Sequence, residues 1–218
     1  MEHTTLKIEP LQYRFPREEF DYQTLLNVLK AYSRPRDKIT DLIRKGIIIR
    51  VKKGLYVLGD RFRMRPYSRE LLANLVYGPS YISMEYALQY YGMIPERVEA
   101  VTSVTTGRSR RFITPLGLFI YRNIPLSAFH VGMTRIEYDD NTAFLFATPE
   151  KALCDKIRND QNAGLRSLKD MRHYLIEGLR IDEASLSNLN PDYIDEVARH
   201  YGSAKLRLLH RSISRMKE

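Results

Sequence analysis

The chain has 218 residues, 44% of them hydrophobic and 28% charged, with a net charge of +9. This hydrophobic content suffices for a buried core and excludes general disorder. No run of about 18 apolar residues exists, and the first residues lack the apolar segment of a secretory signal, so we expect no membrane partner. The single cysteine, Cys154, excludes a disulfide framework and favours a cytoplasmic location.

The positive charge is concentrated in one sixth of the sequence. Residues 34–69 hold twelve Lys or Arg and three Asp, and the remainder of the chain holds 23 basic and 23 acidic residues. The whole excess of positive charge therefore lies in this segment. Such a concentration is typical of a surface that binds a polyanion, with nucleic acid as the leading candidate.

Two short helices are predicted before this segment ends. Leucines at three- and four-residue steps predict a helix over 21–32, with Asp21 as its N-cap. Pro35 suits the first turn of a second helix over 36–45, which Gly46 is placed to end.

A β-hairpin follows the second helix. The β-branched run 47–51 and the apolar run 55–58 read as two strands, and 52–54 forms the turn between them. Helix, turn, helix and hairpin in this order indicate a winged helix-turn-helix. We therefore predict a DNA-binding domain over 1–62, with the boundary in the connector 60–67.

The remainder, 63–218, is predicted to be a mixed α/β domain with a helical C-terminal part, which makes the fold class α+β. We expect helices over 68–77, 84–91, 149–158, 165–178, 192–201 and 203–217, and strands over 98–105, 111–114, 117–122 and 142–147. Ser83 and Thr148 are expected to cap the helices that follow them.

In a helix-turn-helix, the second helix enters the major groove while the hairpin reaches phosphates or the minor groove. The predicted DNA-binding residues are Arg34, Arg36, Lys38, Thr40, Arg44, Lys45, Arg50, Lys52 and Lys53. Asp37 and Asp41 would repel phosphates, unless Asp41 pairs locally with Arg44 or Lys45. The alternative is an ordinary amphipathic helix that packs one face on a core.

Outside this unit, a second group of residues is a candidate interaction surface. It comprises Tyr81, Tyr90, Tyr91, Arg108, Arg110 and Arg111. Tyrosine is enriched at interfaces, and the arginines follow a hydroxyl-rich stretch that could bind phosphate. The alternatives are that the tyrosines edge a core and that the arginines belong to a solvated turn.

The sequence predicts no catalytic site, metal site or cofactor. P-loop, dinucleotide-binding, zinc-protease and nucleophile-elbow motifs are all missing from it. Cys154 lies in an apolar run and is expected to be buried. A remote alternative is a metal-dependent nuclease that uses Glu150 or Asp155 together with Lys151 or Lys156.

Four segments together resemble one known family. Residues 38–58, 77–88, 102–122 and 147–153 are similar, in the same order, to the AbiEi family of type IV antitoxins. The resemblance implies a DNA-binding antitoxin and transcriptional autorepressor, which binds inverted repeats in double-stranded DNA at its own promoter. It also implies a functional partner, a nucleotidyltransferase-like toxin, and a contribution to phage defence by abortive infection.

The resemblance places the DNA contacts on the helix at 34–45 and the wing at 50–53, and implies no stable complex with the toxin. Residues after 158 show no such likeness. The competing hypothesis is a stand-alone winged-helix regulator whose α/β domain senses a ligand or a protein.

Overall fold

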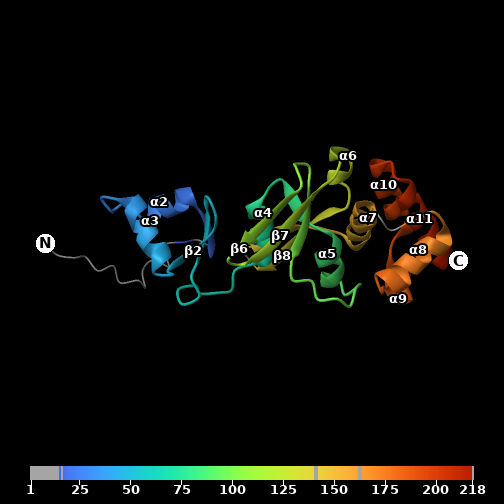
Figure 1. The fold of residues 1–218 in the computed structure, drawn as a ribbon, viewed down its shortest axis with the longest axis horizontal. Coiled ribbons are helices and arrows are strands. Elements are labelled where there is room, and N and C mark those ends of the chain that lie inside the picture. The colour runs from blue at the N-terminus through green and yellow to red at the C-terminus, as the bar shows by residue number, and fades with distance from the viewer. Residues whose placement is uncertain (1–14, 16, 140–141, 162–163, 218) are drawn as a thin grey trace.

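The computed structural model describes residue 15 and residues 17–139, 142–161 and 164–217. Residues 1–14 and 16 of the predicted N-terminal domain lie outside the described part. The protein is α+β and elongated. An N-terminal unit, a central mixed sheet and a group of C-terminal helices follow one another along its long axis (Figure 1).

The N-terminal unit contains helix, turn, helix and hairpin in the predicted order. Its elements are β1 (Glu19–Asp21), α2 (Tyr22–Val28), α3 (Pro35–Arg44), β2 (Ile48–Lys52) and β3 (Leu55–Leu58). The strands form an antiparallel sheet in the order β1-β3-β2. β1 was not predicted, because three residues are too few to show a strand period.

Local signals in the sequence explain where these helices begin and end. The Asp21 carboxylate accepts a hydrogen bond from the backbone N–H of Thr24 at 2.7 Å, which caps α2 as predicted. Pro35 occupies the first turn of α3. Gly46 follows α3 with φ of +66°, a conformation that glycine adopts without strain, and so turns the chain into β2.

Strand β3 of the hairpin is buried on both faces. Tyr56 and Leu58 of β3 pack in the core of the N-terminal unit, beneath α2 and α3. Leu55 and Val57, which alternate with them and point to the opposite face, belong to the core of the central domain. Since Val51 of β2 joins that second core as well, the hairpin is shared by the two parts of the chain.

The connector from β3 to α4 (Arg69–Val76) crosses the predicted boundary and is held by two glutamates near β1. Glu18 Oε1 accepts from the backbone N–H groups of Met64 at 3.1 Å and Arg65 at 3.3 Å. Glu19 Oε1 accepts from Ser68 N at 2.7 Å, and burial raises the pKa of this glutamate. These contacts fasten the connector to the N-terminal sheet.

The central sheet has the strand order β6-β7-β5-β4-β9-β8. β4 pairs with β9 and β5 with β7 in parallel, and the other neighbours are antiparallel. The bounds are β4 (Ser80–Ile82), β5 (Val101–Thr105), β6 (Arg110–Thr114), β7 (Gly117–Asn123), β8 (Met133–Asp139) and β9 (Thr142–Ala147). Strands β4 and β8 were not predicted from the sequence.

Helices α4, α5 (Met84–Tyr90) and α7 (Pro149–Asn159) pack on this sheet, and the short α6 (Leu126–Phe129) follows β7. Thr148 caps α7 as predicted, since its hydroxyl accepts from Lys151 N at 3.3 Å. Ser83 does not cap α5 with its side chain. Its hydroxyl instead donates to Asp155 on α7 at 2.7 Å, so Ser83 occupies the expected N-cap position without forming the capping hydrogen bond.

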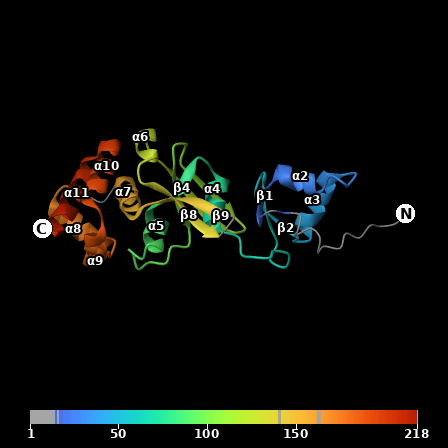
Figure 2. The ribbon, with the colours of Figure 1, turned by 180° about the vertical axis from the view of Figure 1, so that it is seen from behind.

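The C-terminal helices pack against α7, which lies between them and the sheet in both views (Figure 1, Figure 2). They are α8 (Leu168–His173), which continues as a π-helical turn η1 (Tyr174–Gly178), and then α9 (Glu183–Asn188), α10 (Pro191–Tyr201) and α11 (Ala204–Met216). The sequence did not predict α9. Across the described residues, no helix has the length and apolar character needed to cross a bilayer.

Candidate nucleic-acid interface and polar pocket

Helix α3 presents a polar face to solvent above its buried residues. Ile39 and Leu42 are buried, whereas Arg36, Thr40 and Arg44 are exposed. Arg34 before the helix and Lys45 after it are exposed as well. The helical period thus places most of the predicted contacts on the accessible side of α3.

The Asp41 carboxylate forms ion pairs with three cations of this helix. Asp41 lies 2.8 Å from Arg44 Nη2, 2.9 Å from Lys45 Nζ and 3.4 Å from Lys38 Nζ. These partners, Lys45 foremost, lower the pKa of Asp41 to about 2. The expected local pairing of Asp41 with Arg44 or Lys45 is confirmed for both residues. One negative charge therefore offsets part of the positive charge of the helix.

The predicted DNA-binding residues of α3 differ in the exposure of their side chains and in the contacts that these side chains form within the protein. Arg44 keeps 78% of its side chain exposed although it contacts Asp41. The Thr40 hydroxyl donates to the Arg36 carbonyl at 3.2 Å, one turn earlier, so it is engaged within the helix. Lys38 is partly buried over the Tyr32 ring, 5.3 Å from its centroid.

Of the three predicted DNA-binding residues in the hairpin, two are exposed and one faces the protein. Arg50 and Lys53 are exposed. Lys52 is partly buried, and its ammonium donates to the carbonyl oxygen of Val76 at the end of α4, 2.5 Å away. Burial lowers the pKa of Lys52. The prediction that Lys52 lies at a free wing tip is therefore corrected, because this side chain joins the hairpin to the central domain.

The second predicted surface does not form one patch. Tyr81 is fully buried, because β4 lies inside the sheet between β5 and β9, so its placement on a surface was wrong. Tyr90 is half exposed, and the Tyr91 hydroxyl donates to the Ala147 carbonyl at 2.8 Å. Both tyrosines thus lie by β9, where the Tyr90 ring centroid is 4.8 Å from that of Phe146 and the two rings are tilted by 51°.

The predicted arginines lie elsewhere. Arg110 and Arg111 are exposed on β6, the edge strand beyond β7, and Arg108 is exposed in the turn before it. Ile113, on the same strand, is 82% exposed. Three strands separate β6 from β9 in the sheet, so the structure does not bring these arginines together with the tyrosines.

A buried ionic network lies where α7 meets α5 and α10. Lys151 Nζ is 2.6 Å from Asp155 Oδ1, and neither side chain is exposed. The Tyr201 hydroxyl donates to Asp155 Oδ1 at 2.5 Å and accepts from Lys151 at 3.1 Å. Ser83 donates to the second carboxylate oxygen of Asp155. Every charge in the network is paired and hydrogen-bonded, as a buried charge requires.

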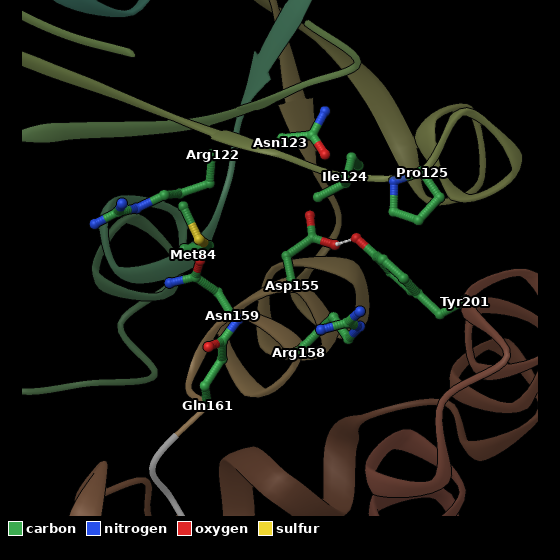
Figure 3. Close-up of a pocket in the computed structure, with 10 residues that line it drawn as sticks. All are labelled: Met84, Arg122, Asn123, Ile124, Pro125, Asp155, Arg158, Asn159, Gln161 and Tyr201. Atoms are coloured by element: carbon green, nitrogen blue, oxygen red, sulfur yellow. Dashed lines mark hydrogen bonds between the residues drawn. The ribbon is translucent and has the colours of Figure 1, made fainter. Parts of the chain in front are cut away.

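Asp155 also forms part of the floor of a polar pocket of about 260 Å³ (Figure 3). Arg122 and Asn123 at the end of β7 line this pocket from one side, and Arg158 from α7 lines it from the other. The full lining is Met84, Arg122, Asn123, Ile124, Pro125, Asp155, Arg158, Asn159, Gln161 and Tyr201.

This pocket was not predicted from the sequence. Asp155 and Lys151 were named only as options of the remote nuclease hypothesis, beside Glu150 and Lys156, and no role was expected for Arg122, Arg158 or Tyr201. These residues come from three elements that are distant in the sequence, so no local spacing connects them.

The remaining candidates of that hypothesis are engaged in structural contacts. Glu150 accepts from the backbone N–H of Asn190 at 3.1 Å, and Lys156 lies 2.9 Å from Glu85 and 2.9 Å from Asp160. In the described part of the chain, no group of three His, Cys, Asp or Glu side chains is arranged to hold a metal ion.

No family model and no curated protein matches the chain.

Proposed function

We propose that this protein is a DNA-binding antitoxin and transcriptional autorepressor of a type IV toxin–antitoxin operon. In this proposal the N-terminal unit binds double-stranded DNA at the protein's own promoter. The domain over 63–218 counters a nucleotidyltransferase-like toxin, as the family resemblance implies, and direct contact with that toxin is not required.

The exposed basic face of α3 is the observation that supports the DNA-binding part of the proposed function. Arg36, Arg44 and Lys45 are exposed on or just after a helix whose opposite side is buried in the core. A helix presented in this way can enter the major groove, where an arginine binds guanine through two hydrogen bonds. Exposed Arg50 and Lys53 of the hairpin add cations for phosphates.

The first experiment is fluorescence anisotropy with the DNA upstream of the protein's own gene and with a scrambled duplex, across a salt series. We expect tighter binding to the natural sequence and a log affinity that falls steeply with log salt, since each neutralised phosphate contributes about one unit of slope. Weak binding that is equal for both duplexes at every salt concentration would contradict the repressor function.

The antitoxin half is tested separately, by co-expression with the neighbouring gene in a growth assay. Relief of the growth arrest by the full chain, and by an Arg44→Ala variant with reduced operator binding, would support neutralisation that is independent of DNA. If growth arrest persists with the soluble full chain present, the antitoxin function is wrong.

A second candidate function is a stand-alone regulator whose α/β domain senses a small ligand. The polar pocket between β7 and α7 favours it, because a regulator of this kind needs such a cavity in the domain next to its DNA-binding unit. The neighbouring gene discriminates between the two functions, since a regulator without a toxin partner would not relieve a growth arrest.

A further inference from the structure

The pocket above Asp155 has a polarised lining. Arg122 and Arg158 are both exposed at its rim, and neither forms an ion pair with another described residue. On the floor, Asp155 is neutralised by Lys151 at 2.6 Å. The rim therefore carries two uncompensated positive charges, whereas the floor carries no net charge. Asp155 is almost fully buried and its Oδ1 already accepts from Lys151 and Tyr201, so only Oδ2, which accepts from Ser83, has room for a further donor.

Asn123 adds a further acceptor. Its amide nitrogen donates to the carbonyls of Thr106 at 3.2 Å and Gly107 at 2.7 Å, which fixes the orientation of the amide. In Figure 3 the amide oxygen lies on the side of Asp155 and the nitrogen points away from it. The interior of the pocket thus presents hydrogen-bond acceptors, and the rim presents cationic donors.

The backbone at this pocket is strained. Met84, which lines it, has φ of +58° although it is not a glycine. Positive φ in a residue of this kind costs about 1–3 kcal/mol, and such strain gathers at binding and catalytic sites. Close to the network, the buried Tyr81 hydroxyl has no hydrogen-bond partner among the described residues, and burial, followed by the nearby Asp155 carboxylate, raises its pKa.

This arrangement selects one class of small molecule. A phosphate group suits the two guanidinium groups, which bind phosphate through charge-assisted hydrogen bonds. Sugar hydroxyls suit the acceptors beneath, since a hydroxyl donates to a carboxylate or amide oxygen. The cavity of about 260 Å³ lies just below the usual range for small-molecule sites and excludes a large ligand from its interior.

We propose that this pocket binds a ribose phosphate, either free or as part of a nucleoside monophosphate. In Figure 3 the Arg122 guanidinium points away from Arg158, so in the proposed complex this exposed side chain turns inward for both arginines to contact the phosphate. The ribose hydroxyls hydrogen-bond to Asn123 and Asp155. The site is separate from α3 and the hairpin, and the inference does not depend on DNA binding.

The test is isothermal titration calorimetry of the full chain with ribose 5-phosphate, AMP, adenosine and inorganic phosphate. We expect the two ribose phosphates to bind more tightly than adenosine and than inorganic phosphate. Tighter binding of AMP than of ribose 5-phosphate would identify a nucleotide site, and equal binding would identify a sugar-phosphate site. Absence of binding by both ribose phosphates, or equally tight binding of inorganic phosphate, would overturn the proposal.

Three exposed arginines provide the variants. Arg122→Gln and Arg158→Gln are each expected to weaken binding of the ribose phosphates by about tenfold or more, because each removes one charged donor. Arg207→Gln, on the exposed side of α11, is the matched control and is expected to leave binding unchanged. Equal effects of all three variants would overturn the assignment to this pocket.

A parallel measurement separates this inference from the proposed function. The Arg122→Gln and Arg158→Gln variants are titrated with the upstream DNA in the anisotropy assay, and we expect wild-type affinity without added ribose phosphate. Loss of operator binding together with ribose phosphate binding would indicate that these arginines contact DNA phosphates, and would overturn the proposal of a separate small-molecule site.

Discussion

The Lys52 ammonium donates a hydrogen bond to the Val76 carbonyl, 2.5 Å away, and joins the tip of the β2–β3 hairpin to the end of α4. Leu55 and Val57 of the same hairpin pack in the central core. The two neighbouring lysines therefore have different roles in the proposed function. Lys52 fixes the hairpin, and exposed Lys53 is available to phosphates.

Substitutions of these two lysines are expected to have different consequences. Lys52→Met keeps the apolar stem but leaves the Val76 carbonyl unpaired, which lowers the free energy of unfolding by about 1–2 kcal/mol. Lys53→Met changes stability by less than about 0.5 kcal/mol but reduces the salt slope of DNA binding by about one unit. Urea denaturation measures stability and anisotropy measures the salt slope. Equal losses of stability in Lys52→Met and Lys53→Met would contradict the different roles of the two lysines.

Asp41 limits the positive charge of α3. Asp41→Asn removes the shared partner of Arg44, Lys45 and Lys38. We expect tighter binding to both operator and scrambled DNA, and therefore lower selectivity, with a steeper salt slope in anisotropy titrations. Asp195→Asn on α10 is the control, because a charge beyond the Debye length of about 10 Å is largely screened. An unchanged affinity for scrambled DNA in Asp41→Asn would exclude this role.

The charge of the Asp41 carboxylate depends on pH only in the acidic range. The cations hold the pKa of Asp41 at about 2, so the carboxylate stays ionised as the pH falls and is protonated only near that value. Its contribution to stability is present above the pKa of an unfolded aspartate, about 3.9, and is lost as the pH falls toward 2. Lowering the pH from 7 to 5 is therefore expected not to reproduce the Asp41→Asn binding curve.

Arg44 is the residue of α3 that we expect to contact a base and so to distinguish the operator from other DNA sequences. Arg44→Ala should cost roughly 1–3 kcal/mol on the operator and little on the scrambled duplex, because the loss is a base contact. Arg36→Ala, an exposed arginine nearer the start of the helix, should weaken both duplexes alike, as expected for a phosphate contact. Anisotropy at one fixed salt concentration measures both variants. Equal losses for Arg44→Ala would show that it contacts phosphate rather than a base.

The sequence predicted those features that depend on near neighbours. The helix-turn-helix order follows from apolar spacing, and the caps at Asp21 and Thr148 follow from one side chain reaching a backbone N–H three residues ahead. The pairing of Asp41 with Arg44 and Lys45 depends on the same helical period. Each of these contacts spans four residues or fewer.

The features that it missed depend on distant partners. Tyr81 was placed on a surface because tyrosine is enriched at interfaces, yet the strands β5 and β9 on either side of β4 bury it. Lys52 meets Val76, 24 positions later. Ser83 was expected to cap α5 but donates to Asp155, 72 positions later. In each case the environment of the side chain depends on tertiary packing with distant segments, which the local sequence does not reveal.

Cys154 is expected to be unreactive while the protein is folded. Its side chain is fully buried on α7, and burial raises the pKa of its thiol, so very little thiolate forms. Titration with a chromogenic disulfide reagent should detect no fast thiol in buffer and one thiol per chain in denaturing urea. Rapid modification in buffer, with the circular dichroism spectrum unchanged, would show that the α7 region opens in the native state.

The buried Lys151–Asp155 pair is expected to show strong coupling. Asp155→Ala leaves the Lys151 ammonium, which has no exposed surface, without its anion, and should lower the free energy of unfolding by about 3–5 kcal/mol. The double variant Lys151→Met with Asp155→Leu removes both charges and should regain most of that loss, because apolar residues of similar volume replace a desolvated pair.

Urea denaturation of the single and double variants measures this coupling. Asp195→Asn is a matched surface control, since it breaks the exposed pair with Arg199 at 3.2 Å and should cost no more than about 1 kcal/mol. If the double variant instead loses the sum of the losses measured for Lys151→Met alone and Asp155→Leu alone, the ion pair contributes no coupling. The network of Tyr201, Ser83 and the two charges would then be held by packing between α5, α7 and α10 alone.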